Sequence, residues 1–591
     1  MLQAKEFYEQ QLARFISKKE QIRKQMLFLS IGRLLSFLGI IIAIYCFFGQ
    51  WNYMLFVTLP LLIAFIVLLQ KYTQKKKEEQ YAKQRIHINK LELLALEGEY
   101  SAFATGKKYK DPKHAYSEDI DLFGQRSFFQ YLTRCHTSQG EAYLASLLKS
   151  NDIKNVSEKQ NLIKELTDRP NWRQDYMTTT SLMDPTFDLP NLLSWLENYK
   201  GFTKFYFKWL PKVYGVISII WVLLLSQGIV SAYVFGGWLI LGIMISNRYQ
   251  KGISNLTLNL SKHHELLSHY AQLLARIEQQ KFSSQLLLQE QAKLKTSHNT
   301  KASQEIAYLS RKLQNLEHGG NLFVKIFGNG LFLYELWTSY PVEKWLEAHA
   351  DQIKDWIQTT AFFEAQISLS NFAYNHPRYT YPKLDTSKAI FKAQSLCHPL
   401  LLQNQAVSSD VNIHDSEFLI ITGANMAGKS TFLRSVSLAI VMSNMGMPIR
   451  AEKAQYQPIP LLTSMRTTDS LDEETSYFFA ELKRLRFIVD HLEDHKCFII
   501  LDEILKGTNS TDKADGSIRF VKKMVAMQAT GLIATHDLSL CELENELPQI
   551  RNYFFDTQIQ KDELYFDYKL KPGICSDRNA TFLLEKMKII E

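Results

Sequence analysis

Apolar residues are concentrated in four runs, which are separated by charged sequence of helical periodicity. Residues 26–48 are almost unbroken apolar sequence, and residues 53–69 form a second run after a short uncharged link. Two further runs, 213–230 and 231–245, adjoin each other with Gln227-Gly228 as the expected turn. A membrane span needs roughly 20 apolar residues. The pattern predicts two transmembrane helical hairpins, although the second, with its shorter runs, also fits a buried soluble hairpin.

Basic residues flank both predicted hairpins, whereas the two tight links carry no charge. Lysine and arginine mark the cytoplasmic side of membrane spans. We therefore expect a multi-pass membrane protein whose termini and long segments lie in the cytoplasm. Arg33 lies inside the first run near its start, where its aliphatic stem can extend toward the basic flank. The flanking basic residues are Lys18, Lys19, Arg23, Lys24, Lys71, Lys75, Lys76, Lys77, Lys204, Lys208, Lys212, Arg248 and Lys251.

Between and after the hairpins, leucines and isoleucines recur at helical spacing, notably over 119–199 and 248–318. Such stripes are typical of cores or coiled-coil seams rather than binding sites. Helices broken at Gly319-Gly320 and 328–330 are expected next, and the proline-containing stretch 376–382 is typical of a linker.

Composition narrows the function classes only slightly. The net charge of +8 is spread along the chain and permits contact with nucleic acid or anionic lipid without favouring either. Six scattered cysteines without a CxxC pair disfavour a disulfide framework or a zinc site and fit a reducing compartment. We expect no metal beyond one that accompanies a nucleotide.

The strongest chemical signal is a glycine-rich loop that follows the strand-like run 418–421. Its pattern GxxxxGK[ST] is that of a phosphate-binding loop, in which backbone N–H groups and a helix N-terminus bind phosphate oxygens. Lys429 is expected to reach the β- and γ-phosphates, and Ser430 to hold Mg²⁺. The predicted ATP-binding residues are Gly423, Ala424, Asn425, Met426, Ala427, Gly428, Lys429, Ser430 and Thr431.

Two more strand-like runs end in residues suited to nucleotide hydrolysis. Residues 497–501 end in Asp502, predicted to hold Mg²⁺ with Ser430, and Glu503, predicted to polarise the attacking water. Residues 531–534 precede His536, which is placed to contact the γ-phosphate. The predicted catalytic residues are therefore Glu503, His536 and Lys429. Ser476 precedes the expected helix 478–492 and is equally well interpreted as an ordinary cap or as an anion ligand.

Three segments, 422–434, 501–510 and 534–536, resemble the ATPase domain of the MutS family of DNA mismatch repair ATPases. That family's loop reads TGPNMGGKST and its second motif DEIGRGTS. Here Ala424 and Ala427 replace a proline and a glycine, and neither change removes a phosphate or metal ligand.

The resemblance implies an ABC-type ATPase with ATP and Mg²⁺ as cofactors. It also implies a homodimer of ATPase domains in which Ser476, the signature serine, faces the nucleotide of the other subunit. DNA is a candidate partner on the same grounds. His398-Pro399 and Lys571-Pro572-Gly573 match the family pattern near the two ends of the domain.

The departures from the family concern what the ATPase acts on. The mismatch-binding domain has no counterpart, and a membrane hairpin is expected in its place. Residues 248–375 are short for both lever helices and a full DNA clamp, and no helix-turn-helix tail is expected before residue 591. Where relatives carry a histidine that packs on adenine, residues 552–555 offer aromatic side chains.

The expected fold is an α/β P-loop (ABC-type) ATPase domain preceded by an all-α core and lever region with two transmembrane hairpins. The expected function is a membrane-anchored MutS-like ATPase that hydrolyses ATP in a dimeric composite site coupled to DNA binding. The alternatives are a membrane-associated mechanochemical ATPase or a nucleotide-gated scaffold with no DNA role. The expected boundaries are an N-terminal helix 1–25, hairpin 26–70, connector 71–112, core segment 113–203, hairpin 204–247, lever 248–375 and ATPase domain 376–591.

Overall fold

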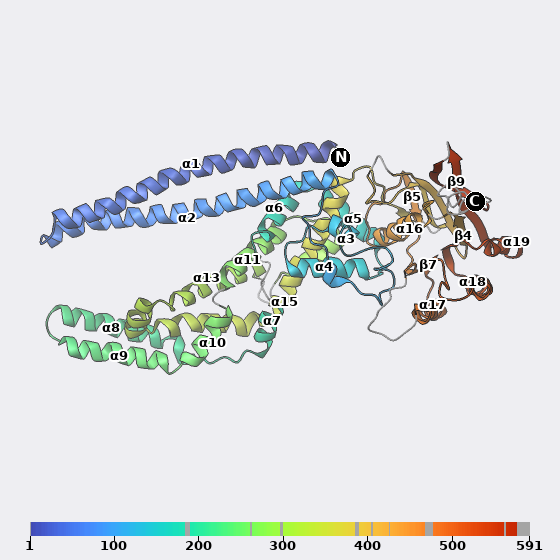
Figure 1. The fold of residues 1–591 in the computed structure, drawn as a ribbon. Helices are drawn as coiled ribbons and strands as arrows, with labels where there is room; N and C mark the ends of the chain where they lie inside the picture. Colours follow the sequence, from blue (N-terminus) through green and yellow to red (C-terminus); the bar gives the residue numbers. More distant parts are fainter. Residues whose placement is uncertain are drawn as a thin grey trace.

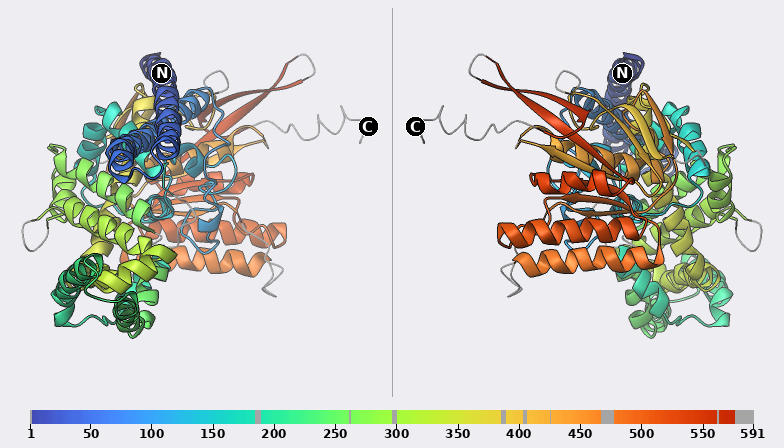
Figure 2. Two further views of the ribbon diagram at one scale, coloured as in Figure 1. Left: turned by 90° about the vertical axis from the view of Figure 1, so that its left-hand side faces the viewer. Right: turned by 90° about the vertical axis from the view of Figure 1, so that its right-hand side faces the viewer.

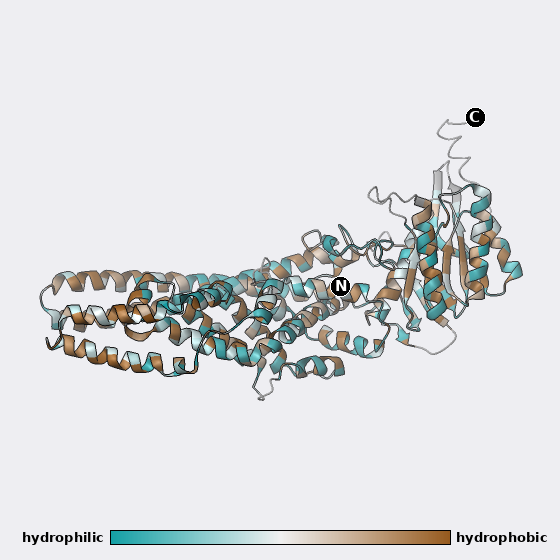
Figure 3. Cartoon of the chain, turned by 90° about the horizontal axis from the view of Figure 1, so that it is seen from below, coloured by the Kyte–Doolittle hydropathy of each residue, from teal (hydrophilic) through white to brown (hydrophobic). Residues whose placement is uncertain are grey.

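The computed structural model describes residues 2–183, 189–260, 263–295, 300–384, 389–402, 406–424, 426–466, 477–560 and 563–575. The molecule is elongated, with a sheet-containing domain at one end and two helical hairpins that extend from the other (Figure 1). A helical core lies between them. Hydrophobic positions are dense along the hairpins at the end remote from the sheets (Figure 3).

The first hairpin consists of α1 (Leu2–Cys46) and α2 (Trp51–Leu96), which pack along each other. Each is one continuous helix. The charged segments and apolar runs that were expected as separate segments therefore follow one another along the same helix without a break. Glycines at positions 32 and 39 bring α1 close to leucine side chains of α2. The guanidinium of Arg33 lies 4.6 Å from the centre of the Tyr72 ring. Among the described residues, α1 and α2 are the two helices long and apolar enough to cross a membrane, by length and composition alone.

The second hairpin consists of α8 (Leu210–Ser226) and α9 (Ala232–Asn247), and its turn falls where the sequence places it. Tyr214 stacks on Trp238 with ring centres 4.4 Å apart, and its hydroxyl donates to the Trp238 carbonyl. With 17 and 16 residues, these helices are at the short limit for a membrane span. Both hairpins extend in the same direction from the core (Figure 1).

The helical core is organised around α15 (Tyr334–Asn375), whose C-terminal half is almost entirely buried. Residues 319–333, where the sequence predicts breaks, hold a short π-helical turn (Val324–Gly328) and α14 (Asn329–Phe332). The surrounding helices are α3 (Phe128–Leu132), α4 (Ser138–Lys149), α5 (Val156–Thr167), α6 (Pro170–Thr180), α7 (Leu189–Asn198), α10 (Gln250–Leu260), α11 (His264–Gln279), α12 (Gln285–Ala292) and α13 (Ala302–His318), with short 3₁₀ turns η1 (Lys107–Tyr109) and η2 (Phe205–Lys208).

The C-terminal domain contains a six-stranded sheet of order β10-β9-β4-β8-β7-β6, in which all neighbours are parallel except β10 and β9. The three predicted strands are β4 (Phe418–Gly423), β7 (Phe498–Asp502) and β8 (Thr530–Ala534). The others are β6 (Leu461–Ser464), β9 (Ile550–Gln560) and β10 (Glu563–Pro572). The associated helices are α16 (Lys429–Asn444), α17 (Tyr477–Asp494), α18 (Ser510–Ala526), η5 (Leu538–Glu542) and α19 (Leu543–Glu546). Figure 2 shows α17 and α18 together on one side of this sheet.

A second sheet, of order β1-β5-β2-β3, completes this domain and is not predicted by the sequence pattern. Its strands are β1 (Lys383–Leu384), β2 (Ala389–Leu396), β3 (Ser409–His414) and β5 (Lys453–Tyr456).

Polar contacts fasten the sheet domain to the helical core. The Thr463 hydroxyl donates to Asp119 Oδ2 at 2.5 Å, and the backbone N–H of Arg466 donates to Asp119 Oδ1 at 2.7 Å. Asp121 accepts from the Arg466 guanidinium and lies 3.2 Å from Arg434 Nη1. The loop that precedes α3 is therefore anchored to strand β6 and helix α16.

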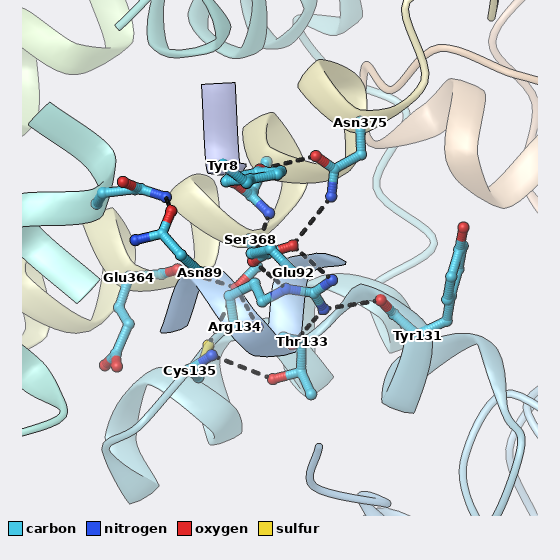
Figure 4. Close-up of polar contacts among 12 residues, drawn as sticks. Tyr8, Asn89, Glu92, Tyr131, Thr133, Arg134, Cys135, Glu364, Ser368 and Asn375 are labelled. Carbon is cyan, nitrogen blue, oxygen red and sulfur yellow. Dashed lines mark hydrogen bonds and ion pairs between the residues drawn. The ribbon is translucent and has the colours of Figure 1, made fainter. Parts of the chain in front are cut away.

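A buried ion pair fastens the base of the first hairpin to α15 (Figure 4). Arg134 Nε donates to Glu92 Oε1 at 2.6 Å, and its Nη2 donates to Oε2 at 3.2 Å. Asn371 and Asn375 on α15 also donate to the Glu92 carboxylate. The Tyr8 hydroxyl, from α1, donates to Asn375 Oδ1 at 2.8 Å. Both hairpin helices thus meet α15 in one polar network.

Candidate functional site

The phosphate loop connects β4 to α16 and has the backbone conformation that its glycines allow. Gly423 has φ +142° and Gly428 has φ +110°, values that other residues rarely adopt. A Cβ on Gly423 would lie 2.8 Å from the Phe555 carbonyl oxygen. Because α16 begins at Lys429, its N-terminus supplies unpaired N–H groups at the loop. Asn425 lies outside the described residues.

A cleft of about 590 Å³ opens over this loop, a volume typical of small-molecule sites. Its polar end is formed by residues of the phosphate loop and by Glu503. Its other walls carry apolar and aromatic side chains from β2, from the loop between β2 and β3, and from the β9–β10 hairpin. These are Leu396, His398, Leu401, Val407, Phe555 and Tyr568. The cleft therefore combines a polar end, at the phosphate loop, with an apolar end.

Lys429 lies at the polar end, almost completely buried. Its Nζ donates to the carbonyl oxygens of Gly423 at 2.7 Å and Ala424 at 3.1 Å, and it lies 3.1 Å from His536 Nε2. Burial lowers the pKa of the Lys429 ammonium, while the carboxylates of Glu503 and Asp502 oppose that shift. These contacts hold the Lys429 ammonium over the loop.

Ser430 and Asp502 come together although 72 residues separate them. The Ser430 hydroxyl donates to Asp502 Oδ2 at 2.8 Å. Burial raises the pKa of the Asp502 carboxyl, and the Ser430 hydrogen bond partly offsets this. A hydroxyl and a carboxylate side by side are the oxygen ligands that Mg²⁺ prefers, so these residues fit the ion.

Glu503 and His536 form the third contact of the site. Glu503 Oε1 lies 3.0 Å from His536 Nε2, and this hydrogen bond lowers the pKa of Glu503 to about 2 against the opposing effect of burial. The Glu503 N–H donates to the Ala534 carbonyl at 2.9 Å, which ties the end of β7 to β8. Glu503 has φ +49°, a left-handed conformation that is uncommon outside glycine.

Glu481, on α17, was not among the predicted site residues. Its carboxylate accepts from the backbone N–H groups of Leu505 at 2.6 Å and Lys506 at 3.1 Å. It is 3% exposed, and burial raises its pKa. Glu481 therefore holds the loop that follows Glu503. The signal that could have identified it is an acidic residue on the side of the predicted helix that becomes buried. Ser476, just before α17, lies outside the described residues.

Tyr568 was also missed. It lies in β10 with φ +53°, within the register shift between β9 and β10. A Cβ on Gly428 would lie 3.2 Å from its ring, so the ring closes over the end of the phosphate loop. Of the aromatic residues at 552–555, Phe555 lines the cleft and packs against Phe432 at 5.7 Å. The sequence does not reveal Tyr568 because the β9–β10 hairpin is not evident from its pattern.

Comparisons with known proteins agree with this geometry. The family model MutS domain V matches residues 419–585. The MutS protein homolog 4 of Homo sapiens is 30% identical over 193 residues, which cover 31% of this chain and 20% of that protein. The DNA mismatch repair protein MutS of Chloroflexus aurantiacus is 30% identical over 237 residues, 39% of this chain and 24% of that protein. The DNA mismatch repair protein MSH4 of Arabidopsis thaliana is 26% identical over 245 residues, which cover 39% of this chain and 31% of that protein.

The matched region thus spans between 20% and 31% of the length of these relatives. It coincides with the six-stranded sheet, the phosphate loop and the Asp502-Glu503 edge described above. Over residues 419–585 the chain matches MutS domain V, so its C-terminal domain is similar to that of MutS proteins.

Proposed function

We propose that this chain is a membrane-anchored MutS-type ATPase that binds ATP with Mg²⁺ and hydrolyses it. The supporting observation is the convergence of Lys429, the Ser430–Asp502 pair and the Glu503–His536 pair at one end of a single cleft. These residues come from the phosphate loop and from the ends of two neighbouring parallel strands. In open parallel sheets, ligands bind at that edge.

We assign one task to each of these residues. Lys429 and the N-terminus of α16 bind the β- and γ-phosphates. Ser430 and Asp502 would hold Mg²⁺, which would neutralise charge on the phosphate oxygens. The Glu503 carboxylate, kept ionised by its contact with His536, orients and polarises a water for in-line attack on the γ-phosphate. The apolar end of the cleft, with Tyr568 and Phe555, is suited to the base.

Exchange of Glu503 for glutamine tests the hydrolytic assignment. Removing a positioned base lowers turnover by about 10²–10⁴-fold. We expect Glu503→Gln to retain ATP binding while turnover of the detergent-solubilised full chain falls by that factor. Glu493→Gln, an exposed position at the far end of α17, is the matched control and should hydrolyse ATP normally. Normal turnover in Glu503→Gln would refute the assignment.

Membrane anchoring through both hairpins is supported by the exposed apolar surfaces of α1, α2, α8 and α9. A fully apolar helix surface is typical of membrane spans. The basic residues near the bases of the hairpins favour a cytoplasmic ATPase domain. We also propose dimerisation through the ATPase domains, with Ser476 completing the site of a second copy, on the similarity of the C-terminal domain to MutS proteins.

We propose DNA as the binding partner on which the ATPase cycle acts, because the named relatives include DNA mismatch repair proteins. The test is binding of matched, mismatched and branched duplexes by the full chain in detergent, with and without ATP. Salt-dependent binding that ATP changes would support a DNA role. Absence of binding at low salt would favour the alternative, a mechanochemical membrane ATPase that does not act on DNA.

A further inference from the structure

A third apolar element lies between α13 and α15, outside the two hairpins. We call residues 321–337, which include the π-helical turn, α14 and the first residues of α15, the connecting segment. Six of its large apolar side chains are between 40% and 73% exposed. They are Leu322, Phe323, Ile326, Phe327, Phe332 and Trp337. An exposed apolar cluster of this size on a monomer marks an interaction surface.

The connecting segment packs directly on the second hairpin. A Cβ on Gly242 of α9 would lie 2.6 Å from the Asn329 carbonyl oxygen, and one on Gly330 would lie 3.0 Å from the Leu239 side chain. A Cβ on Gly215 of α8 would meet the Phe332 ring at 3.0 Å. These contacts lie five residues from the end of each hairpin helix that joins the core, or roughly 8 Å along the helix axis.

Two polar side chains of the connecting segment, Asn329 and Glu335, are buried and paired with each other. Asn329 Nδ2 donates to Glu335 Oε2 at 3.0 Å, and the Glu335 N–H donates to Asn329 Oδ1 at 3.0 Å. The Tyr334 hydroxyl donates to the Asn315 carbonyl at 2.8 Å. Lys325 is an exposed charge whose long stem allows its ammonium to extend toward water. An element with an apolar exterior and internally paired polar groups suits hydrocarbon rather than water.

We propose that the connecting segment is a re-entrant element that inserts into the cytoplasmic leaflet beside the second hairpin. Lipid acyl chains are the occupant of its exposed face. The apolar surface continues from Phe327 and Phe332 around both α8 and α9, where Ile219, Leu223 and Leu241 are also exposed. A protein partner covers one face, whereas lipid covers such a surface on all sides. The inference rests on the proposed membrane anchoring.

Depth-dependent quenching tests the inference on the full chain in phosphatidylcholine–phosphatidylglycerol vesicles. The background is Cys46→Ser, because Cys46 is the exposed one of the six free cysteines. Single cysteines replace Phe327, Leu38 on α1, Ile220 on α8, or Gln314 on α13, and each carries a polarity-sensitive fluorophore. Leu38 and Ile220 are 44% and 50% exposed. Nitroxide lipids labelled near the headgroup or deep in the acyl chain are the quenchers, and the labelled background chain is the blank.

We expect blue-shifted emission at Phe327→Cys and stronger loss of fluorescence with the shallow nitroxide than with the deep one. Ile220→Cys should respond more to the deep nitroxide, and Gln314→Cys to neither. Loss at Leu38→Cys and Ile220→Cys without loss at Phe327→Cys overturns the inference and leaves the anchoring intact. No loss at Leu38→Cys or Ile220→Cys refutes the anchoring itself. Blue-shifted emission at Phe327→Cys without quenching shows a protein occupant, such as a second copy, and also overturns the inference.

Discussion

At the scale of single residues, His536 links the two charged groups of the site. Its Nε2 atom lies within hydrogen-bond distance of both Lys429 Nζ and Glu503 Oε1. One nitrogen cannot serve both, because it accepts from the ammonium only when it lacks a proton and donates to the carboxylate only when it carries one. A change of tautomer at His536 therefore exchanges the contact with Lys429 for the contact with Glu503. It thereby alters how firmly the Glu503 side chain is held in place.

Lys429→Ala is expected to weaken nucleotide binding. Hydrogen bonds to charged groups contribute about 1.5–3 kcal/mol each, so the dissociation constant of ATP should rise at least about tenfold. Fluorescent-nucleotide titration measures the change. Lys496→Ala removes an exposed lysine paired with Asp415 at 2.9 Å and is the matched control. Equal affinity in the two variants would contradict the placement of Lys429.

A second residue-scale prediction concerns Glu364, which is buried in the helical core. Its carboxyl group accepts from the backbone N–H groups of His136 and Thr137 and from the Thr137 hydroxyl. Burial raises the pKa of Glu364 from 4.5 to about 7, while these hydrogen bonds oppose the shift and the Glu141 carboxylate adds to it. Between the two values the folded chain binds one proton more than the unfolded chain.

The free energy of unfolding should therefore fall as pH rises from about 4.5 to about 7, by about 3 kcal/mol at most, and be constant above that range. Thermal unfolding of the solubilised chain across this window measures the slope. Glu364→Gln should flatten it, whereas Glu347→Gln, at an exposed position paired with Lys344, should leave it unchanged. An identical slope in both variants would rule out Glu364 as its source.

At the scale of elements, the polar network around the Glu92–Arg134 pair joins the base of the first hairpin to α15. Removing one partner of a buried ion pair costs about 3–5 kcal/mol, because the other charge stays buried and unpaired. Arg134→Met should thus lower the thermal midpoint strongly. Glu97→Gln, which removes an exposed 3.5 Å contact with Lys5, should cost less than about 1 kcal/mol. Similar midpoints in both variants would show that the network is not structural.

The elements also show what the sequence can predict. Strands β4, β7 and β8 are fully buried parallel strands, which read as continuous apolar runs, and motif residues fix their ends. The second sheet escaped prediction because β2 pairs with β5, which follows it by about 60 residues, and with β3 through register shifts. Asp502, Glu503 and His536 were predicted as site residues because they follow the ends of strands. The positions of Glu481 and Tyr568, in contrast, depend on packing that a sequence pattern does not specify.

At the scale of the whole molecule, the parallel course of the two hairpins predicts a common topology. Cysteines placed at the tips, Asn52→Cys and Gln227→Cys, should both react with a membrane-impermeant maleimide from the side opposite the ATPase domain. Gln314→Cys, on α13, should react only from the ATPase side. Labelling of Asn52→Cys without Gln227→Cys from the far side would show that the second hairpin does not cross.

Helix α15 has a mechanical consequence. Its 42 residues correspond to roughly 63 Å of unbroken helix, which starts within the connecting segment and ends at the entry to the sheet-containing C-terminal domain. The His376 ring at its C-terminal end is bonded to the Tyr131 hydroxyl at 2.7 Å. Because the helix is one continuous rod, a tilt of about 5° about one end moves its other end by roughly 5 Å. Sub-ångström adjustments around a phosphate would thus reach the lipid as displacements about the size of a side chain.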